Sequence, residues 1–275
     1  KARISDTAVD IFVYDTSKDS DGGAWRHRTQ NTSWYNEVPS MTRGARKEFP
    51  AVAVIVVTSG AAYEPVITIY DGDDPNLPMW MRFKTNETSY AANFMIWGTY
   101  HVRMKNGWLY TGSPQGNGYE NVITRVNFIS EESGLITADG LWYGYKSIAD
   151  RNTANLPGSA SSTYDTSTLK LLDNSVTALA MTVLKSSPID VKTGLPNPTV
   201  AIQSAKGVTI IKDNDTYNNM QGTVNVGLYR GPSIAFTKDE KLLYNMANDG
   251  GNNYSIVMVI PLSVFASNKT KGYEY

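Results

Sequence analysis

Short runs of β-branched and aromatic residues, separated by Gly, Asp, Asn and Ser, recur along the whole chain. The longest is residues 51–58, a nearly continuous apolar run of the kind found in strands that are covered on both faces. Residues 66–70 and 79–83 follow as two more strand-like runs, separated by residues 71–75, which are rich in Asp and Gly. This part of the chain therefore predicts three consecutive strands joined by turns.

The rest of the chain carries the same pattern. Asn106 and Gly107 stand between two strand-like runs, and Asn-Gly is the strongest short signal for a hairpin turn. The pattern shows no convincing amphipathic helix longer than about three turns. The other predicted strands are residues 9–14, 94–97, 102–104, 108–111, 122–129, 140–145, 176–184, 224–229, 233–236, 241–246 and 254–262. Together they predict an all-β protein.

Part of this pattern occurs twice. Residues 50–54 match residues 198–202, and after a Gly-containing turn residues 66–73 match residues 208–215. A strand, a turn, a second strand and an Asp-containing corner make up a supersecondary unit, so the match indicates a structural repeat.

The predicted strands fall into four groups, which begin at Val52, Val102, Val176 and Val224. Their recurrence favours a β-propeller, in which four-stranded sheets repeat radially. The alternative, a β-sandwich or jelly roll, explains the strands but not the repeat. At about 45 residues per blade, the length of the chain fits five or six blades.

We expect residues 1–275 to form a single β-propeller-like domain, which is either incomplete or part of a larger propeller. The sequence begins with Lys1, Ala2 and Arg3, without an initiator Met or an apolar signal-like block. This start predicts a processed chain or the N-terminal part of a longer one.

The composition narrows the classes of function. The chain has 275 residues, of which 41% are hydrophobic, so it can bury a sizeable core. A net charge of −1 gives no general reason to expect nucleic acid or an anionic membrane as a partner. The absence of cysteine excludes disulfides, thiolate metal sites and a Cys nucleophile. The longest apolar run is about half the length that crosses a bilayer, so membrane insertion is not expected.

No catalytic motif stands out. The two histidines, His27 and His101, are not part of an HExxH pair, and Gly-x-Ser-x-Gly, Walker and GxGxxG motifs are absent. No cofactor is expected. A pair of carboxylates for hydrolysis stays open, because it requires only two acids at the right separation. The acids available for such a pair include Glu37, Asp71, Asp73, Asp74 and Asp139.

The carboxylates at residues 71–74 form the densest acidic cluster, and a hard cation is one conceivable ligand. However, Asp213 and Asp215 recur at the matching corner of the repeat, as expected for a structural turn. We therefore predict a turn there and no metal site. Residues 15–23 also match no EF-hand loop, and we interpret them as a turn satisfied by Asp side chains.

Residues 25–48 are the best candidate for a binding segment. They combine aromatic and cationic side chains with little periodicity, and long connections inside compact domains are often functional. The predicted binding residues are Trp25, Arg26, His27, Arg28, Trp34 and Tyr35. The alternative is that the aromatic side chains fill the core and hold the connection against the body.

Several long peptides, in a fixed order, point to a known family. They are residues 13–25 (VYDTSKDSDGGAW), 32–37, 43–44, 49–54, 69–75, 77–81, 178–184, 188–190, 193–196 and 198–201. In these peptides the chain resembles a family of large virion-associated structural proteins of marine tailed bacteriophages. Residues 85–175 match this family less clearly.

The resemblance implies propeller-type repeats in a long chain and a non-catalytic structural or adhesive role in a tail, fibre or related virion part. The implied partners are other virion proteins, copies of the same chain or a host cell-surface glycan. No catalytic residue carries over from the family. Two alternatives are a glycan-degrading enzyme on a propeller scaffold, with exposed Trp and Tyr stacking on sugars, and a non-viral lectin of the same fold.

Overall fold

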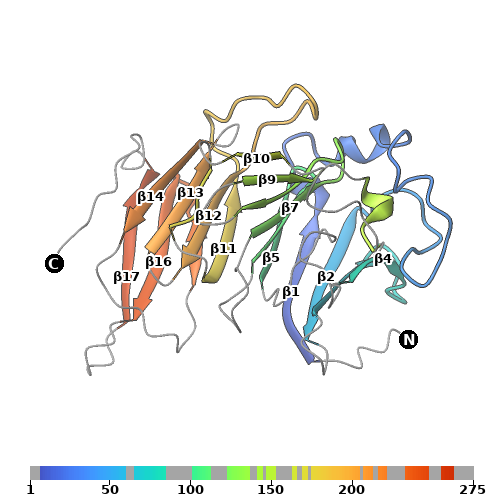
Figure 1. Ribbon diagram of the computed structural model, residues 1–275, viewed down its shortest axis with the longest axis horizontal. Helices are drawn as coiled ribbons and strands as arrows, with labels where there is room; N and C mark the ends of the chain where they lie inside the picture. Colours follow the sequence, from blue (N-terminus) through green and yellow to red (C-terminus); the bar gives the residue numbers. More distant parts are fainter. Residues whose placement is uncertain are drawn as a thin grey trace.

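A computed structural model shows an all-β protein made of antiparallel sheets, with a few single turns of 3-10 helix in the described part (Figure 1). It describes residues 7–59, 65–84, 101–112, 123–136, 141–144, 147–152, 163–165, 169–172, 175–204, 207–212, 216–221, 233–247 and 255–262. The all-β prediction is confirmed. The predicted strands at residues 94–97 and 224–229 lie outside the described residues.

The described strands form four sheets, and neighbours in each sheet are consecutive in the sequence. The first sheet contains β1 (Thr7–Asp15), β2 (Val52–Ser59), β3 (Pro65–Asp71) and β4 (Met79–Lys84). The second contains β5 (His101–Lys105), β6 (Trp108–Gly112), β7 (Ile123–Asn127), β8 (Ser133–Ile136), β9 (Leu141–Gly144) and β10 (Thr163–Asp165).

The third sheet contains β11 (Val176–Thr182), β12 (Thr199–Ser204), β13 (Gly207–Lys212) and β14 (Thr216–Gln221). The fourth contains β15 (Ile234–Phe236), β16 (Lys241–Ala247) and β17 (Ser255–Pro261). Each sheet is thus an antiparallel meander, which needs only short connections between successive strands.

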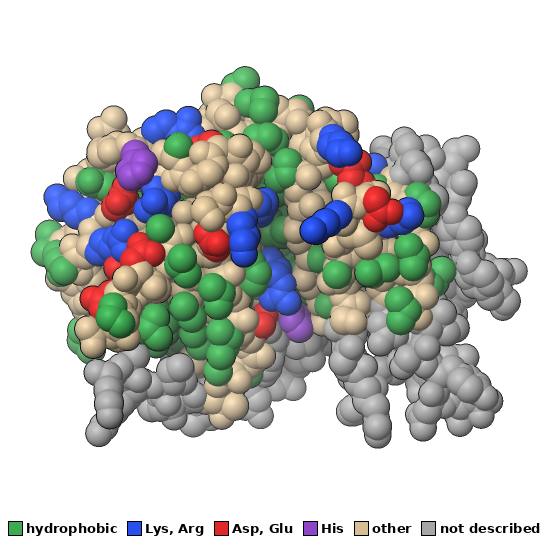
Figure 2. All heavy atoms as spheres, turned by 180° about the vertical axis from the view of Figure 1, so that it is seen from behind, with side chains coloured by type: hydrophobic (Ala, Val, Ile, Leu, Met, Phe, Trp, Pro, Cys, Tyr) green, Lys and Arg blue, Asp and Glu red, His purple; other side chains and the backbone are tan. Residues whose placement is uncertain are grey.

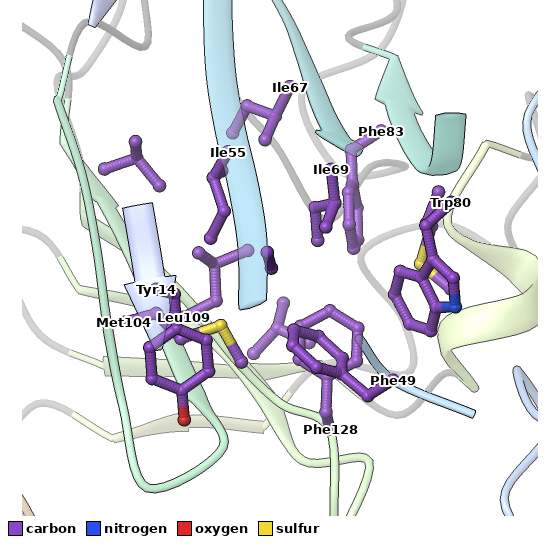
Figure 3. Close-up of a cluster of buried hydrophobic side chains, with 14 of the residues drawn as sticks. Tyr14, Phe49, Ile55, Ile67, Ile69, Trp80, Phe83, Met104, Leu109 and Phe128 are labelled. Carbon is purple, nitrogen blue, oxygen red and sulfur yellow. The ribbon is translucent and has the colours of Figure 1, made fainter. Parts of the chain in front are cut away.

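The four sheets pack face to face in a row. Successive sheets contact each other mainly through their first strands: β1 lies against β5 and β5 against β11 (Figure 1), and β11 lies against β15. Three apolar cores result, which we call the first, second and third core in the order of the sheets that they join. Figure 3 shows part of the first core, where the rings of Phe49 and Phe128 pack together below Ile55 and Ile69 of the first sheet.

Successive side chains of a strand point to opposite faces of the sheet, so the second and third sheets contribute side chains to two cores each. In the second sheet, Met104 and Leu109 enter the first core, whereas Trp108 and Tyr110 enter the second. Residues 51–58 behave similarly: from Ile55 to Thr58, β2 is buried on both faces, as its continuous apolar run predicts.

The predicted repeat is confirmed at the level of strands. Its two halves form β2–β3 and β12–β13, the second and third strands of their four-stranded sheets. The residue register differs, however. Ile69 pairs with Ile55, whereas its sequence counterpart Ile211 pairs with Val200, which matches Val52, so the two hairpins are offset by three residues.

The predicted grouping of strands needs correction. The first sheet begins with β1 and not at Val52, because β1 pairs with β2 across the long connection of residues 16–51. Strands β8, β10 and β14 were not predicted. They are short or rich in Asn, Gln, Ser and Gly, so their pairing partners decide their conformation rather than their own residues.

Candidate functional site

The candidate site is the connection between β1 and β2, residues 16–51, which we call the β1–β2 connection. It contains two short 3-10 helices, Thr16–Lys18 and Ala24–Arg28, and lies at one end of the first and second sheets (Figure 1). The Asp-satisfied turn predicted at its start is confirmed, since Asp15 accepts from the Ser17 backbone N–H and Asp21 accepts from that of Gly23.

Trp25 and Trp34 are fully buried, which favours the core-filling alternative for both rings. The Trp34 indole N–H donates to the Phe128 carbonyl at 2.9 Å, and its ring makes an edge contact with Trp80. Trp25 packs against Phe49 with 5.2 Å between ring centroids. Neither ring is presented to a ligand at the surface, so neither can stack on a sugar in this conformation.

The polar residues predicted to bind lie closer to the surface. His27 contacts the Glu48 carboxylate through Nδ1, and the Arg26 and Arg46 guanidinium groups lie 3.9 and 4.0 Å from the same carboxylate. Arg28 pairs with Asp21 at 2.9 Å.

Tyr35 is half-buried, with the Lys47 ammonium 5.9 Å from the centre of its ring. Binding of a partner by Arg26, His27, Arg28 and Tyr35 stays a prediction.

The buried carboxylate of Asp19 links the connection to the second sheet. It accepts from the Tyr14 hydroxyl, from Trp25 Nε1 at 2.9 Å and from the Asn106 backbone N–H at 3.0 Å. The Lys105 ammonium lies 3.7 Å away. Burial and the nearby charge of Asp19 raise the pKa of Tyr14 well above its ordinary value, so this hydroxyl stays protonated and remains a donor.

The turn that receives this carboxylate is the predicted Asn-Gly hairpin. Asn106 and Gly107 have φ values of 48° and 76°, as a two-residue primed turn requires. The Asn106 amide extends the link, because its Nδ2 donates to Ser20 Oγ and to the Pro196 carbonyl in the loop between β11 and β12. The β1–β2 connection therefore joins parts of three sheets.

Further along, the connection is bound to residues 131–151. The Glu131 carboxylate accepts from the Ser33 backbone N–H at 2.9 Å and also from its hydroxyl. Glu37 forms a two-pronged ion pair with the buried Arg151, at 2.6 and 3.0 Å. Arg151 also donates to the Arg82 carbonyl of β4, so the pair ties the connection to the edge of the first sheet.

Arg43 holds the connection together from inside. Its guanidinium is buried, lies 4.7 Å from the Trp80 ring and donates to five backbone carbonyls. Burial lowers the pKa of Arg43 to about 10, with a partly opposing contribution from Glu37. It is therefore still charged at neutral pH, and all its donors remain available.

The acidic corner after β3 is a structural turn, as predicted. Arg46 Nη1 donates to Asp71 and to Asp73, at 2.7 Å each, and Asp73 also accepts from the backbone N–H groups of Ala51 and Val52. Asp74 accepts from the Asn76 backbone N–H. These carboxylates are thus engaged with the chain itself. The described residues include no group of three or more His, Asp or Glu side chains placed to hold a metal ion.

His101, the second histidine, is half-buried at the start of β5. The pKa of His101 lies below the ordinary value, mainly because of burial. The negative charge of Asp10 partly opposes this effect, and the positive charge of Arg103 adds to it. The unfolded chain therefore takes up the proton at a higher pH than the folded one. As the pH falls through about 6.5, the ordinary pKa of histidine, we expect His101 to reduce the free energy of unfolding.

This expectation is checked by thermal unfolding between neutral and mildly acidic pH. His101→Gln should lower the dependence of the melting temperature on pH, whereas His27→Gln, at an exposed position, serves as the matched control. An unchanged slope in His101→Gln would contradict the assignment.

Comparison with protein-family models and with curated proteins finds no match. Among the described residues, no helix is long and apolar enough to span a membrane.

Proposed function

We propose that this chain is a non-catalytic structural or adhesive component of a bacteriophage virion, part of a tail, fibre or related appendage. One observation carries the proposal: the peptides that resemble the virion family also supply the contacts that bind the sheets together. Asp19 lies in the first of these peptides, Glu37 in the second and Arg43 in the third.

Such a network of contacts suits a virion component that must keep its shape when mechanical force acts on it. Buried charged groups that are fully hydrogen-bonded resist separation, because removing one partner leaves the other desolvated and unpaired. The network also spans residues far apart in the sequence, since Asp19 contacts Asn106 and Glu37 contacts Arg151. Relative movement of the first two sheets would break several of these contacts at once.

The finer architecture in this proposal is a β-propeller, incomplete or part of a larger one, with each sheet as a blade. It is supported by the meander order of the strands, by the approach of successive first strands and by inner sheets that are covered on both faces. In such an arrangement the β1–β2 connection would lie on one end of the blades. Partners would be other virion proteins or copies of the chain.

Adhesion to a host cell-surface glycan would use the outside of the β1–β2 connection rather than its two buried indoles. His27 and Arg28 are its exposed predicted residues, and the half-buried Tyr35 lies near Lys47. Polar and cationic groups of this kind recognise acidic sugars better than neutral ones.

The proposal is tested on purified particles of a phage that encodes the chain. We expect tryptic peptides of this chain in the virions at a constant ratio to the major capsid protein across a density gradient. A phage replication enzyme measured in the same fractions controls for carry-over from the lysate. Absence of the peptides from intact particles would overturn the proposal.

A further inference from the structure

The row of four sheets ends in two sheet faces that belong to none of the three cores. On the first sheet this face carries Ile11 and Val13, which are 56% and 58% exposed, beside Val54 of β2. On the fourth sheet it carries Val257 and Val259 of β17, which are 66% and 55% exposed. We call these the first-sheet face and the fourth-sheet face.

The strand registers place more apolar side chains on both faces. On the first sheet, Val13 pairs with the half-buried Val54, whereas Ile11 pairs with Val56, which is 2% exposed and thus already covered within the chain. On the fourth sheet, Val259 pairs with Leu243, which in turn pairs with Ala235 of β15. The exposed apolar part of the first-sheet face is therefore Ile11 and Val13 of β1 with Val54 beside them, and that of the fourth-sheet face extends from β17 over β16 to β15. Figure 2 shows hydrophobic side chains gathered over the first sheet on the back of the molecule.

This composition is unusual for sheet faces in contact with water. An antiparallel sheet with one solvated face normally alternates between apolar and polar residues, and its outward positions are polar. In β1, Ile11 and Val13 point away from the core that receives Phe12 and Tyr14, so both sides of the strand are apolar. In β17, Met258 and Ile260 enter the third core while Val257 and Val259 are exposed.

The molecule itself shows what covers such faces. Each of its three cores joins a face of one sheet to a face of the next, in the same order along the row. The first sheet lacks a preceding sheet and the fourth lacks a following one among the described strands. The exposed apolar residues of their outer faces, Ile11 and Val13 on one and Val257 and Val259 on the other, are of the kind that the three cores bury between sheets.

We propose that the fourth-sheet face of one copy of this chain packs against the first-sheet face of a second copy. The contact continues the row of sheets from one molecule into the next. It is heterologous, because each partner contributes a different face, so repetition gives a ring or a filament instead of a symmetric dimer. The exposed valines of β17 then lie against Ile11 and Val13 and lose their contact with water.

This inference rests on the proposed structural role, and it names a second copy of the chain as one of the partners in that role. The proposed contact between copies and the proposed structural role in a virion can fail independently of each other. The chain can occur in virions without forming this contact, and purified chains can form the contact whether or not virions contain them.

The test uses the full 275-residue chain in sedimentation velocity and light-scattering experiments over a range of concentrations. We expect assembly into species larger than the monomer. Ile11→Lys with Val13→Lys should abolish these species, and so should Val257→Lys with Val259→Lys. The matched control is Ile189→Lys with Val191→Lys, which introduces the same charges at exposed apolar positions outside both faces and should leave assembly unchanged.

Mixing the two variants separates this contact from a symmetric one. Each variant keeps one intact face, so the mixture should form a complex of two chains and stop there, although neither variant assembles alone. Circular dichroism and thermal unfolding of each variant establish that it is folded. The proposal is overturned if the wild-type chain is monomeric at every concentration, if only one of the double variants loses assembly, or if the mixture stays monomeric.

Discussion

Asp19→Ala will lower the free energy of unfolding by about 3–5 kcal/mol, which is among the largest effects expected of a single substitution here. The carboxylate is buried and accepts from the Tyr14 hydroxyl, the Trp25 indole and the Asn106 backbone N–H. Removing it leaves these three donors without their acceptor in a place that water does not reach, and it removes the partner of Lys105.

Urea denaturation followed by circular dichroism measures this loss, and Asp15→Ala is the matched control. Asp15 lies in the same turn but is more exposed, and it accepts from the backbone and side chain of Ser17. Its replacement should therefore lower the free energy of unfolding much less than Asp19→Ala does. Asp19→Asn adds a second comparison. The amide keeps the size of the side chain, but its NH2 group is a donor and faces groups that are themselves donors. Equal losses in Asp19→Ala and Asp15→Ala would contradict the central role of Asp19.

Much of the fold could be predicted because strands leave a local signal. The apolar run of residues 51–58 predicted a strand covered on both faces, and β2 is such a strand. Asn106 and Gly107 predicted a hairpin turn from their backbone preferences alone. Strand β14, with the sequence TYNNMQ, lacks such a signal, because its conformation depends on pairing with β13.

The candidate site was predicted less well because it depends on contacts between residues far apart in the sequence. Residues 25–48 were correctly singled out as an ordered connection of unusual composition. However, aromatic content alone does not distinguish a ring in the core from a ring on the surface, and Trp25 and Trp34 are both in the core. No local pattern indicated that Glu37 pairs with Arg151, 114 positions away.

The connection and the cores stabilise the row of sheets in different ways. The cores contribute through burial of apolar area, which depends little on direction and would tolerate some sliding of one sheet over another. The hydrogen bonds of Asp19, Glu131 and Arg151 depend on direction and fix the connection in one position on the first two sheets. Loss of such a contact should therefore affect both stability and the relative placement of the sheets.

Arg43→Met will lower the free energy of unfolding by about 4 kcal/mol, because it removes donors from five backbone carbonyls at once. Methionine keeps most of the apolar stem, so the loss reports on the guanidinium and its position over Trp80. Those carbonyls belong to the connection and to β4, and no neighbouring side chain can replace a planar group with five N–H donors.

Guanidinium chloride unfolding followed by tryptophan fluorescence measures the effect of Arg43→Met, since Trp34 and Trp80 lie beside the altered group. Arg43→Lys should fall between wild type and Arg43→Met, because an ammonium keeps the charge but cannot reach all five acceptors. The matched control is Arg28→Met, which removes an exposed guanidinium of the same connection and its surface ion pair with Asp21. It should change the free energy of unfolding by about 1 kcal/mol or less. If Arg43→Lys were as stable as wild type, charge and not the geometry of the five hydrogen bonds would hold the connection in place.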